Sequence, residues 1–489
     1  MDESMIGISS KIHDRNTLEF KIGYQVPEGT EYSDFEMSTW IYIPEALDVN
    51  RHTYPRENFY RDMLSYMRLK TPVYPLEMLA HSAELPYQLL EKACKTIVSQ
   101  PTKHHQEEYE KEIKSYASIY KSSLRDTCKY LLTVEDNRMG ILVMQAVNHI
   151  RQIQDNYRSL LKYLQQEHLD ESLLVYFTYG DEFLANVTEQ HLYKMLTRIR
   201  QERAAVYEKI LPTVSVLLDE NTAYSREHGY MLPQQNSADN NAEFVHHAGQ
   251  LKKYIESHLY LPTHKRRNAV FLEQVVFSLA AGLSMVFATV VSFAFQQTYG
   301  NFTLPFFMAL VISYMFKDRI KELVRNYFAN RLSSKIFEYR ININVDDMKL
   351  GWCKEGVAFL TSEKTNPHSL KIRNRHSPLV LGRGTEEQIV FYRKKIHLNR
   401  KVVSKMSAYP LQGVNDIIRY NLSEYMRKMD NPQVPLCVNK GNGQLEVVPG
   451  SKVYYLNFVF RLRDKHNKLY RRYRVCLSSA GIQSIKEYE

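Results

Sequence analysis

The chain has 489 residues, of which 44% are hydrophobic and 24% charged, with a mean hydropathy of −0.42 and a net charge of +10. This length exceeds what one hydrophobic core supports, which excludes a single compact domain. Five scattered cysteines without a CxxC spacing exclude a disulfide framework and a structural zinc site, and they fit a reducing environment. The polar N-terminal segment has no apolar core of signal-peptide type, so we expect no cleavable signal.

Charge is distributed unevenly along the chain. Residues 317–489 carry 33 Lys and Arg against 16 Asp and Glu, a net charge of +17, and residues 1–316 carry −7. The two parts either dock on each other, or the basic part meets anionic lipid headgroups or nucleic acid. We favour docking and lipid contact over nucleic acid.

Two stretches with alternating apolar residues open the chain, at residues 18–26 and 35–43. The period of two predicts two strands, paired as a hairpin or lying side by side. Apolar residues at 59–67 recur at helical spacing and predict a helix that the following prolines end. We assign residues 1–75 to this β-hairpin and helix.

Helical periodicity then dominates, and we assign residues 76–222 to an antiparallel bundle. Its clearest signal is an apolar stripe between Val143 and Leu164, which we interpret as hydrophobic core and not as a cofactor site. Residues 223–243 are rich in Asn, Gln, Ser and Gly and predict a flexible linker. Residues 244–268 predict a juxtamembrane helix.

Residues 274–316 form a run of 43 positions without a charged side chain. A soluble core helix needs only one apolar face, whereas a bilayer core of about 30 Å needs roughly 20 apolar residues per helix. The run therefore predicts a transmembrane hairpin. We place the first helix at 269–296, an external turn at 297–304, and the second span at about 299–316 with its core at 305–316.

Basic residues flank this run on both sides, and they are Lys265, Arg266 and Arg267 before it and Lys317, Arg319, Lys321 and Arg325 after it. By the positive-inside rule both flanks are cytoplasmic. We therefore expect a multi-pass protein of the cell (inner) membrane with both termini and both large domains in the cytoplasm. The second set belongs to a predicted basic amphipathic helix at 317–336, which either lies on the headgroups or stands away from the membrane.

Small residues repeat every four positions within the first predicted span, and they are Ala280, Ser284, Ala288 and Ser292. Such a stripe lets a second helix approach closely. We expect it to pack on the second span, with self-association into a homo- or hetero-oligomer as the alternative.

The loop between the predicted spans contains Tyr299, Gly300 and Asn301 and is followed by Pro305. It is similar to the Gly-Met-Asn loop of the CorA family of magnesium channels. The resemblance implies a pentameric cation channel with this loop as its ion-selecting mouth. The methionine is missing, and Gly-Asn is also a common pair in tight turns.

Residues 337–489 predict a basic α+β domain with an antiparallel sheet. The expected strands lie at 337–345, 357–360, 389–392, 454–462 and 469–477, the last two as a hairpin, and a helix is expected at 414–429.

No catalytic, nucleotide-binding or metal-binding motif is found, so we assign no catalytic, cofactor-binding or metal-binding residue. Six basic residues predict a patch that binds an anionic surface (the anionic-surface patch). They are Arg393, Lys394, Lys395, Arg471, Arg472 and Arg474. Lipid headgroups are the favoured partner, since each Lys or Arg near an anionic membrane contributes about 1 kcal/mol. Interleaved Tyr and His leave single-stranded nucleic acid as the less favoured alternative.

Together these features predict an α+β membrane protein. A two-helix transmembrane hairpin would lie between an N-terminal, mainly helical domain with a leading β-hairpin and a C-terminal α+β domain. We expect a non-enzymatic, membrane-anchored sensor, scaffold or assembly subunit. The alternatives are an oligomeric ion channel or transporter and a membrane-tethered enzyme.

Overall fold

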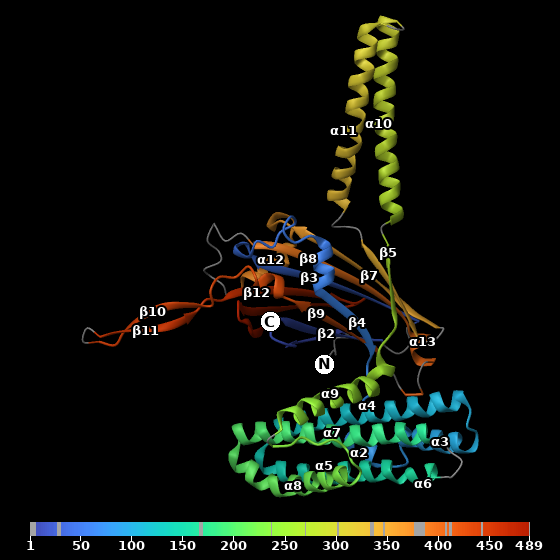
Figure 1. Cartoon of the computed structure of the whole chain (residues 1–489), viewed down its shortest axis with the longest axis vertical. Coiled ribbons are helices and arrows are strands. Elements are labelled where there is room, and N and C mark those ends of the chain that lie inside the picture. The colour runs from blue at the N-terminus through green and yellow to red at the C-terminus, as the bar shows by residue number, and fades with distance from the viewer. Residues whose placement is uncertain are drawn as a thin grey trace. The chain divides into compact units, whose positions relative to one another are not determined.

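The computed structural model describes residues 6–26, 31–165, 170–235, 237–268, 270–300, 303–332, 337–345, 348–375, 387–405, 408–409, 413–441 and 444–488. The protein is α+β and divides into two units (Figure 1). The helical unit comprises Leu69–Tyr260 and Ser407–Gln412. The sheet unit comprises Met1–Arg68, Leu261–Met406 and Gly413–Glu489, so both ends of the chain contribute to it.

The helical unit is a bundle of long helices joined by short connections. Its helices are α2 (Leu76–Ala80), α3 (Leu85–Ser99), α4 (Lys103–Thr133), α5 (Asp136–Ser159), α6 (Leu161–Leu164), α7 (Glu171–Glu202), α8 (Ala204–Glu227), α9 (Ala238–Glu256) and the short η2 (Ser257–Leu259). The predicted stripe from Val143 onward is buried, because α5 packs against α2 and α8. The predicted linker is shorter than expected, since α8 continues to Glu227 and α9 begins at Ala238.

The sheet unit contains three sheets and, among the described residues, six α-helices. Its strands are β1 (Ile6–Ile12), β2 (Thr17–Gln25), β3 (Tyr32–Pro44), β4 (Met63–Leu69), β5 (Thr263–Arg267), β6 (Tyr339–Val345), β7 (Met348–Leu360), β8 (Glu387–Asn399), β9 (Gly413–Asn421), β10 (Gln433–Asn439), β11 (Leu445–Ser451), β12 (Tyr454–Arg463), β13 (Lys468–Ser478) and β14 (Gly481–Tyr488). Its helices are α1 (Arg56–Asp62), α10 (Val270–Tyr299), α11 (Leu304–Leu332), α12 (Pro367–Asn374), α13 (Arg400–Lys405) and α14 (Ser423–Met426), with η1 (Glu45–Leu47) and η3 (Ser362–Lys364) as short 3₁₀ turns.

The strand orders are β1-β2-β9-β4 in the small sheet and β14-β13-β12-β3-β8-β7-β6-β5 in the large sheet. Strands β10 and β11 form a separate two-stranded ribbon. The two larger sheets pack face to face: the ring of Phe20 on β2 lies 5.3 Å from that of Phe458 and 4.7 Å from that of Phe460 on β12, and all three side chains are fully buried. The opposite face of the large sheet is partly covered by α12, whose Ile372 packs with Trp40 and Tyr42 of β3.

The prediction of a leading β-hairpin is wrong. Strands do form at β2 and β3, but β2 pairs with β1 and β9, whereas β3 pairs with β12 and β8 in the other sheet. The connection between β2 and β3 therefore changes sheets. The N-terminal strands belong with the C-terminal ones and not with the helical bundle.

Two predicted helices are partly strands. Residues 59–67 divide between α1 and β4, and residues 414–429 divide between β9 and α14. β9 is a central strand whose two faces are both buried, so its apolar residues do not alternate and its sequence cannot be distinguished from that of a helix.

The predicted two-helix transmembrane hairpin is also wrong. α10 and α11 lie side by side and antiparallel (Figure 1), but only α10 is long and apolar enough among the described residues to cross a membrane. The Arg325 guanidinium on α11 lies 4.2 Å from the centre of the Phe277 ring on α10.

This contact sets the register of the pair and places Lys317 beside the middle of α10. Only residues 304–316 of α11 are then free of charge, about 20 Å of helix against a bilayer core of about 30 Å. The predicted separate helix at 317–336 is instead the continuation of α11, and residues 333–336 lie outside the described residues. The resemblance to CorA channels depends on two spans and loses its basis with them.

Candidate functional site

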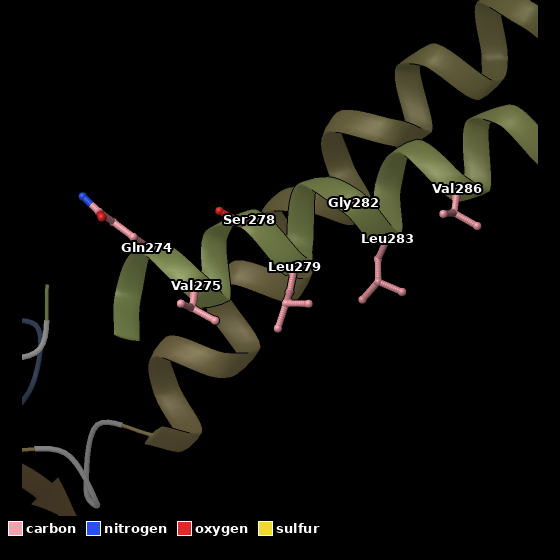
Figure 2. A pocket seen from close by; sticks show the side chains of 7 residues that line it. All are labelled: Gln274, Val275, Ser278, Leu279, Gly282, Leu283 and Val286. Atoms are coloured by element: carbon pink, nitrogen blue, oxygen red, sulfur yellow. The ribbon is translucent and has the colours of Figure 1, made fainter. Parts of the chain in front are cut away.

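The most unusual surface of the protein is the apolar face of α10. The stretch Gln274–Tyr299 is uncharged and mainly apolar, yet only 11% of its most apolar 18 residues is buried, unlike a soluble core helix. Leu279, Val286 and Phe293 are each 60% or more exposed. Figure 2 shows Val275, Leu279, Leu283 and Val286 projecting from one side of α10. With Gln274, Ser278 and Gly282 they line a shallow groove along the helix.

Hydroxyl groups in this apolar region bond back to their own helix. Ser284 donates to the carbonyl of Ala281 at 2.8 Å, Ser292 to Ala288 at 2.8 Å, and Ser313 of α11 to Leu310 at 3.3 Å. Because of these bonds the hydroxyl groups need no hydrogen-bond partner outside their own helix, so they can lie in an apolar environment.

The predicted small-residue stripe is the least exposed part of α10. Ala280 and Ser284 are buried, and Ala288 and Ser292 are half-buried, on a helix whose packing partner is α11. The absence of large side chains there is what close helix packing requires.

The basic residues that flank the apolar run have different surroundings. Lys265 is not a free surface cation, because its Nζ lies 3.6 Å from the buried carboxylate of Glu355 and 4.2 Å from the centre of the Tyr339 ring. Lys317 lies over the ring of Tyr314 at 4.3 Å. Besides Lys265, the exposed members are Arg266 and Arg267 on β5 and Arg319, Lys321 and Arg325 on α11.

The six residues of the predicted anionic-surface patch do not come together. Lys394 faces the interior between the sheets, where it is 1% exposed, and Arg472 is 2% exposed and donates to the Asn457 side chain and the carbonyl of Ile372. Arg471 pairs with Glu487 at 3.3 Å, and the Arg474 guanidinium lies 3.8 Å from the centre of the Tyr455 ring.

Arg393 and Lys395 remain from that patch, and they lie on the outer face of the large sheet. The strand register aligns Lys395 with six residues on neighbouring strands, in the order Lys468, Arg463, Glu36, Lys395, Lys354, Arg340 and Arg266. Residues directly opposite each other in antiparallel strands point to the same face. We call the six Lys and Arg residues of this alignment the basic row.

An aromatic stack borders the basic row on the same face. The ring of His397 on β8 stacks on Trp352 of β7 at 5.2 Å and on Tyr32 of β3 at 5.1 Å, with interplanar angles of 17° and 18°. Lys354 and Arg340 lie 5.1 and 5.4 Å from the centre of the Trp352 ring. No pattern along the chain predicts this site, because its residues belong to separate strands and align only through their register.

A buried ion pair crosses the interior between the two sheets. The Lys394 ammonium on β8 donates to Asp416 on β9 at 2.9 Å and to the Ser65 hydroxyl on β4 at 2.7 Å. Burial disfavours the charged ammonium, but Asp416, Cys353 and Glu355 together outweigh this effect and raise the pKa of Lys394 above its ordinary value. A lysine held in its charged form is a poor base or nucleophile, so we interpret the pair as structural.

The helical unit contains a half-buried histidine that faces several cations. Burial lowers the pKa of His191 on α7 to about 4, and repulsion from Lys194, Lys121 and Arg125 adds to this effect, against a weaker attraction from Asp126. The imidazole is therefore neutral in the folded protein at pH values where the unfolded chain binds a proton.

Because the folded pKa of His191 lies below its unfolded value, stability falls as the pH decreases from about 6.5 to about 4. One proton corresponds to at most about 1.4 kcal/mol per pH unit, and the partly exposed ring reduces the loss to the order of 1 kcal/mol. We expect His191→Gln to flatten this part of the profile in urea unfolding followed by far-UV circular dichroism. The same change at exposed His81 should leave the profile as it is, and a His191→Gln profile parallel to that of the wild type would contradict the prediction.

Comparisons with known proteins give no assignment: the chain matches no protein-family model, no curated protein and no solved structure.

Proposed function

We propose that the protein is a membrane-anchored sensor, scaffold or assembly subunit that is attached to a bilayer through α10. The observation that carries the proposal is the long apolar surface of α10, which none of the described elements other than α11 covers. Burying apolar surface contributes about 25 cal/mol per Å², so an uncovered helix of this length needs an apolar partner.

A lipid bilayer is the partner that fits this surface best. The exposed apolar residues lie along 26 residues of α10, the internal hydroxyls are satisfied within the helices, and exposed Arg and Lys residues lie on α11 beside it. Arg325, which lies beside Phe277 near the start of the apolar surface, would meet lipid headgroups where that surface ends. By the positive-inside rule we place the helical unit and the strands of the sheet unit on the cytoplasmic side.

The test is flotation of the full-length protein with phosphatidylcholine vesicles containing phosphatidylserine. We expect the wild type to float and the variant Leu279→Asp/Leu283→Asp/Val286→Asp to remain in the soluble fraction. Each aspartate in a helix centre costs about 2.5–3.5 kcal/mol in a bilayer. The matched control is Val434→Asp/Leu436→Asp/Val447→Asp, which changes three exposed apolar residues of the β10–β11 ribbon.

Flotation of the α10 variant at the wild-type level would overturn the proposal. An equal loss of flotation in the ribbon variant would also overturn the proposal, because any exposed apolar residues of the protein would then support flotation as well as those of α10. Protease treatment of sealed vesicles formed with the protein's cytoplasmic side outward should digest both units, and protection of either unit would contradict the proposed side.

A further inference from the structure

We propose that the outer face of the large sheet binds single-stranded nucleic acid, with the polymer lying across the strands along the basic row. This function is additional to membrane attachment and does not depend on it. The row crosses seven adjacent strands, and the spacing of about 4.8 Å between strands gives it a length of about 29 Å.

The charge of this face is strongly one-sided. Two further arginines, Arg393 and Arg461, lie one side-chain row away from the basic row, aligned through Ser38 of β3. The two carboxylates among the aligned residues have partners on the same face, since Glu36 accepts from Arg461 at 2.9 Å and Asp34 lies 3.1 Å from Nδ1 of His397. What remains is a field of unbalanced positive charge that attracts a polyanion.

Several of these cations have no anionic partner. Within the described part of the chain, no carboxylate lies within 4 Å of the charged groups of Lys468, Lys395, Lys354 or Arg266. Their charged groups are therefore available to phosphate oxygens.

The aromatic stack supplies the second element that single-strand recognition uses. Tyr32 ends the stack and is 49% exposed, so a base can stack on its outer face. Stacking of a base on an aromatic side chain contributes about 1–3 kcal/mol, and it is available only to unpaired bases. A basic strip with an adjoining aromatic platform on a sheet surface is the arrangement that binds single strands.

The covering of this face by α12 favours a flexible polymer over a membrane. α12 packs on the part of the face that contains Trp40 and Tyr42, which lie two and three side-chain rows from the basic row. A helix is about 10 Å thick, so it would hold a flat bilayer away from Lys395 and Lys354. A single strand can lie beside the helix and follow the row.

The experiment measures fluorescence anisotropy of a labelled single strand of about 16 nucleotides, near the upper site size of small single-strand-binding modules. The full-length protein is used in a non-ionic detergent, with RNA and DNA strands, over a series of salt concentrations. We expect Lys354→Gln/Lys395→Gln/Lys468→Gln to weaken binding at least tenfold. Losing three phosphate contacts should also reduce the slope of log K against log salt by about 2.

Two further variants make the result specific. Lys92→Gln/Lys129→Gln/Lys252→Gln removes the same charge from exposed lysines of the helical unit and should bind like the wild type. Tyr32→Ala removes the outer stacking ring and should weaken binding at least about fivefold with an unchanged salt slope.

Equal binding by the two triple-lysine variants would overturn the proposal. It would also be overturned if a duplex of the same sequence bound as tightly as the single strand, because paired bases cannot stack on Tyr32. Phosphatidylserine vesicles that displace the strand from the wild type and from the α10 aspartate variant alike would show that this face meets lipid, which also overturns it.

Discussion

Replacing Lys394 with alanine should destabilise the sheet unit by about 3–5 kcal/mol, the largest effect we expect from a single side chain. The substitution leaves the Asp416 carboxylate buried and without its cation, while Ser65 can supply only one hydrogen bond, at 3.0 Å. A loss of this size is a large part of the roughly 5–15 kcal/mol that stabilises an ordinary domain.

The measurement can be confined to the sheet unit. The protein has two tryptophans, Trp40 on β3 and Trp352 on β7, and both belong to the large sheet, so tryptophan fluorescence during urea unfolding reports on this unit. Far-UV circular dichroism of the same samples follows the helices.

The matched control replaces both members of the pair, as Lys394→Met/Asp416→Leu. Exchanging a whole buried ion pair for apolar residues is often neutral or stabilising, so this variant should unfold close to the wild type. If Lys394→Ala does not accumulate in folded form, the double variant still tests the argument. Equal stability of Lys394→Ala and the wild type would contradict it, as would failure of the double variant to recover.

Replacing Gly180 with alanine should destabilise the helical unit by about 1–3 kcal/mol, although alanine favours a helix by about 1 kcal/mol. A Cβ at this position of α7 would overlap the hydroxyl oxygen of Tyr157 and lie 2.9 Å from Cγ2 of Ile113. The Tyr157 hydroxyl is fixed in this place because it donates to the carbonyl of Phe177 at 2.9 Å. The core must therefore shift to admit one methyl group.

Gly140→Ala provides the matched control for this prediction. Gly140 lies in α5, and a methyl group added there would meet no atom within 4 Å, so the same change should stabilise the protein by about 0.5–1 kcal/mol. Urea unfolding followed by far-UV circular dichroism measures both variants. A Gly180→Ala protein as stable as Gly140→Ala would show that the contact with Tyr157 is not tight.

Patterns that depend on neighbours in the sequence were sufficient for several predictions. The stripe from Val143 onward predicted a core helix, and the alternation at residues 454–462 and 469–477 predicted the hairpin that the structure has as β12 and β13. In each case one face is buried more completely than the other, so the period of the apolar residues reports the local backbone directly.

The same reasoning failed where burial was not one-sided. Both faces of β9 are buried, which removes the alternation that identifies a strand. The uncharged run at 274–316 predicted two spans. This prediction was wrong because a sequence does not show which residues of α11 lie beside which residues of α10.

Of the two candidate sites, one could be predicted from the sequence and the other could not. The apolar surface of α10 could be predicted, since an uncharged and mainly apolar stretch of 26 residues needs an apolar partner. The basic row could not, because Lys468, Lys395 and Arg266 are far apart in the chain and align only when seven strands pair in one register. The same pairing turned Lys394 inward to Asp416 and left Lys395 outward, since successive residues of a strand point to opposite faces. Strand order is set by long-range packing between sheets, and no local pattern in the sequence encodes it.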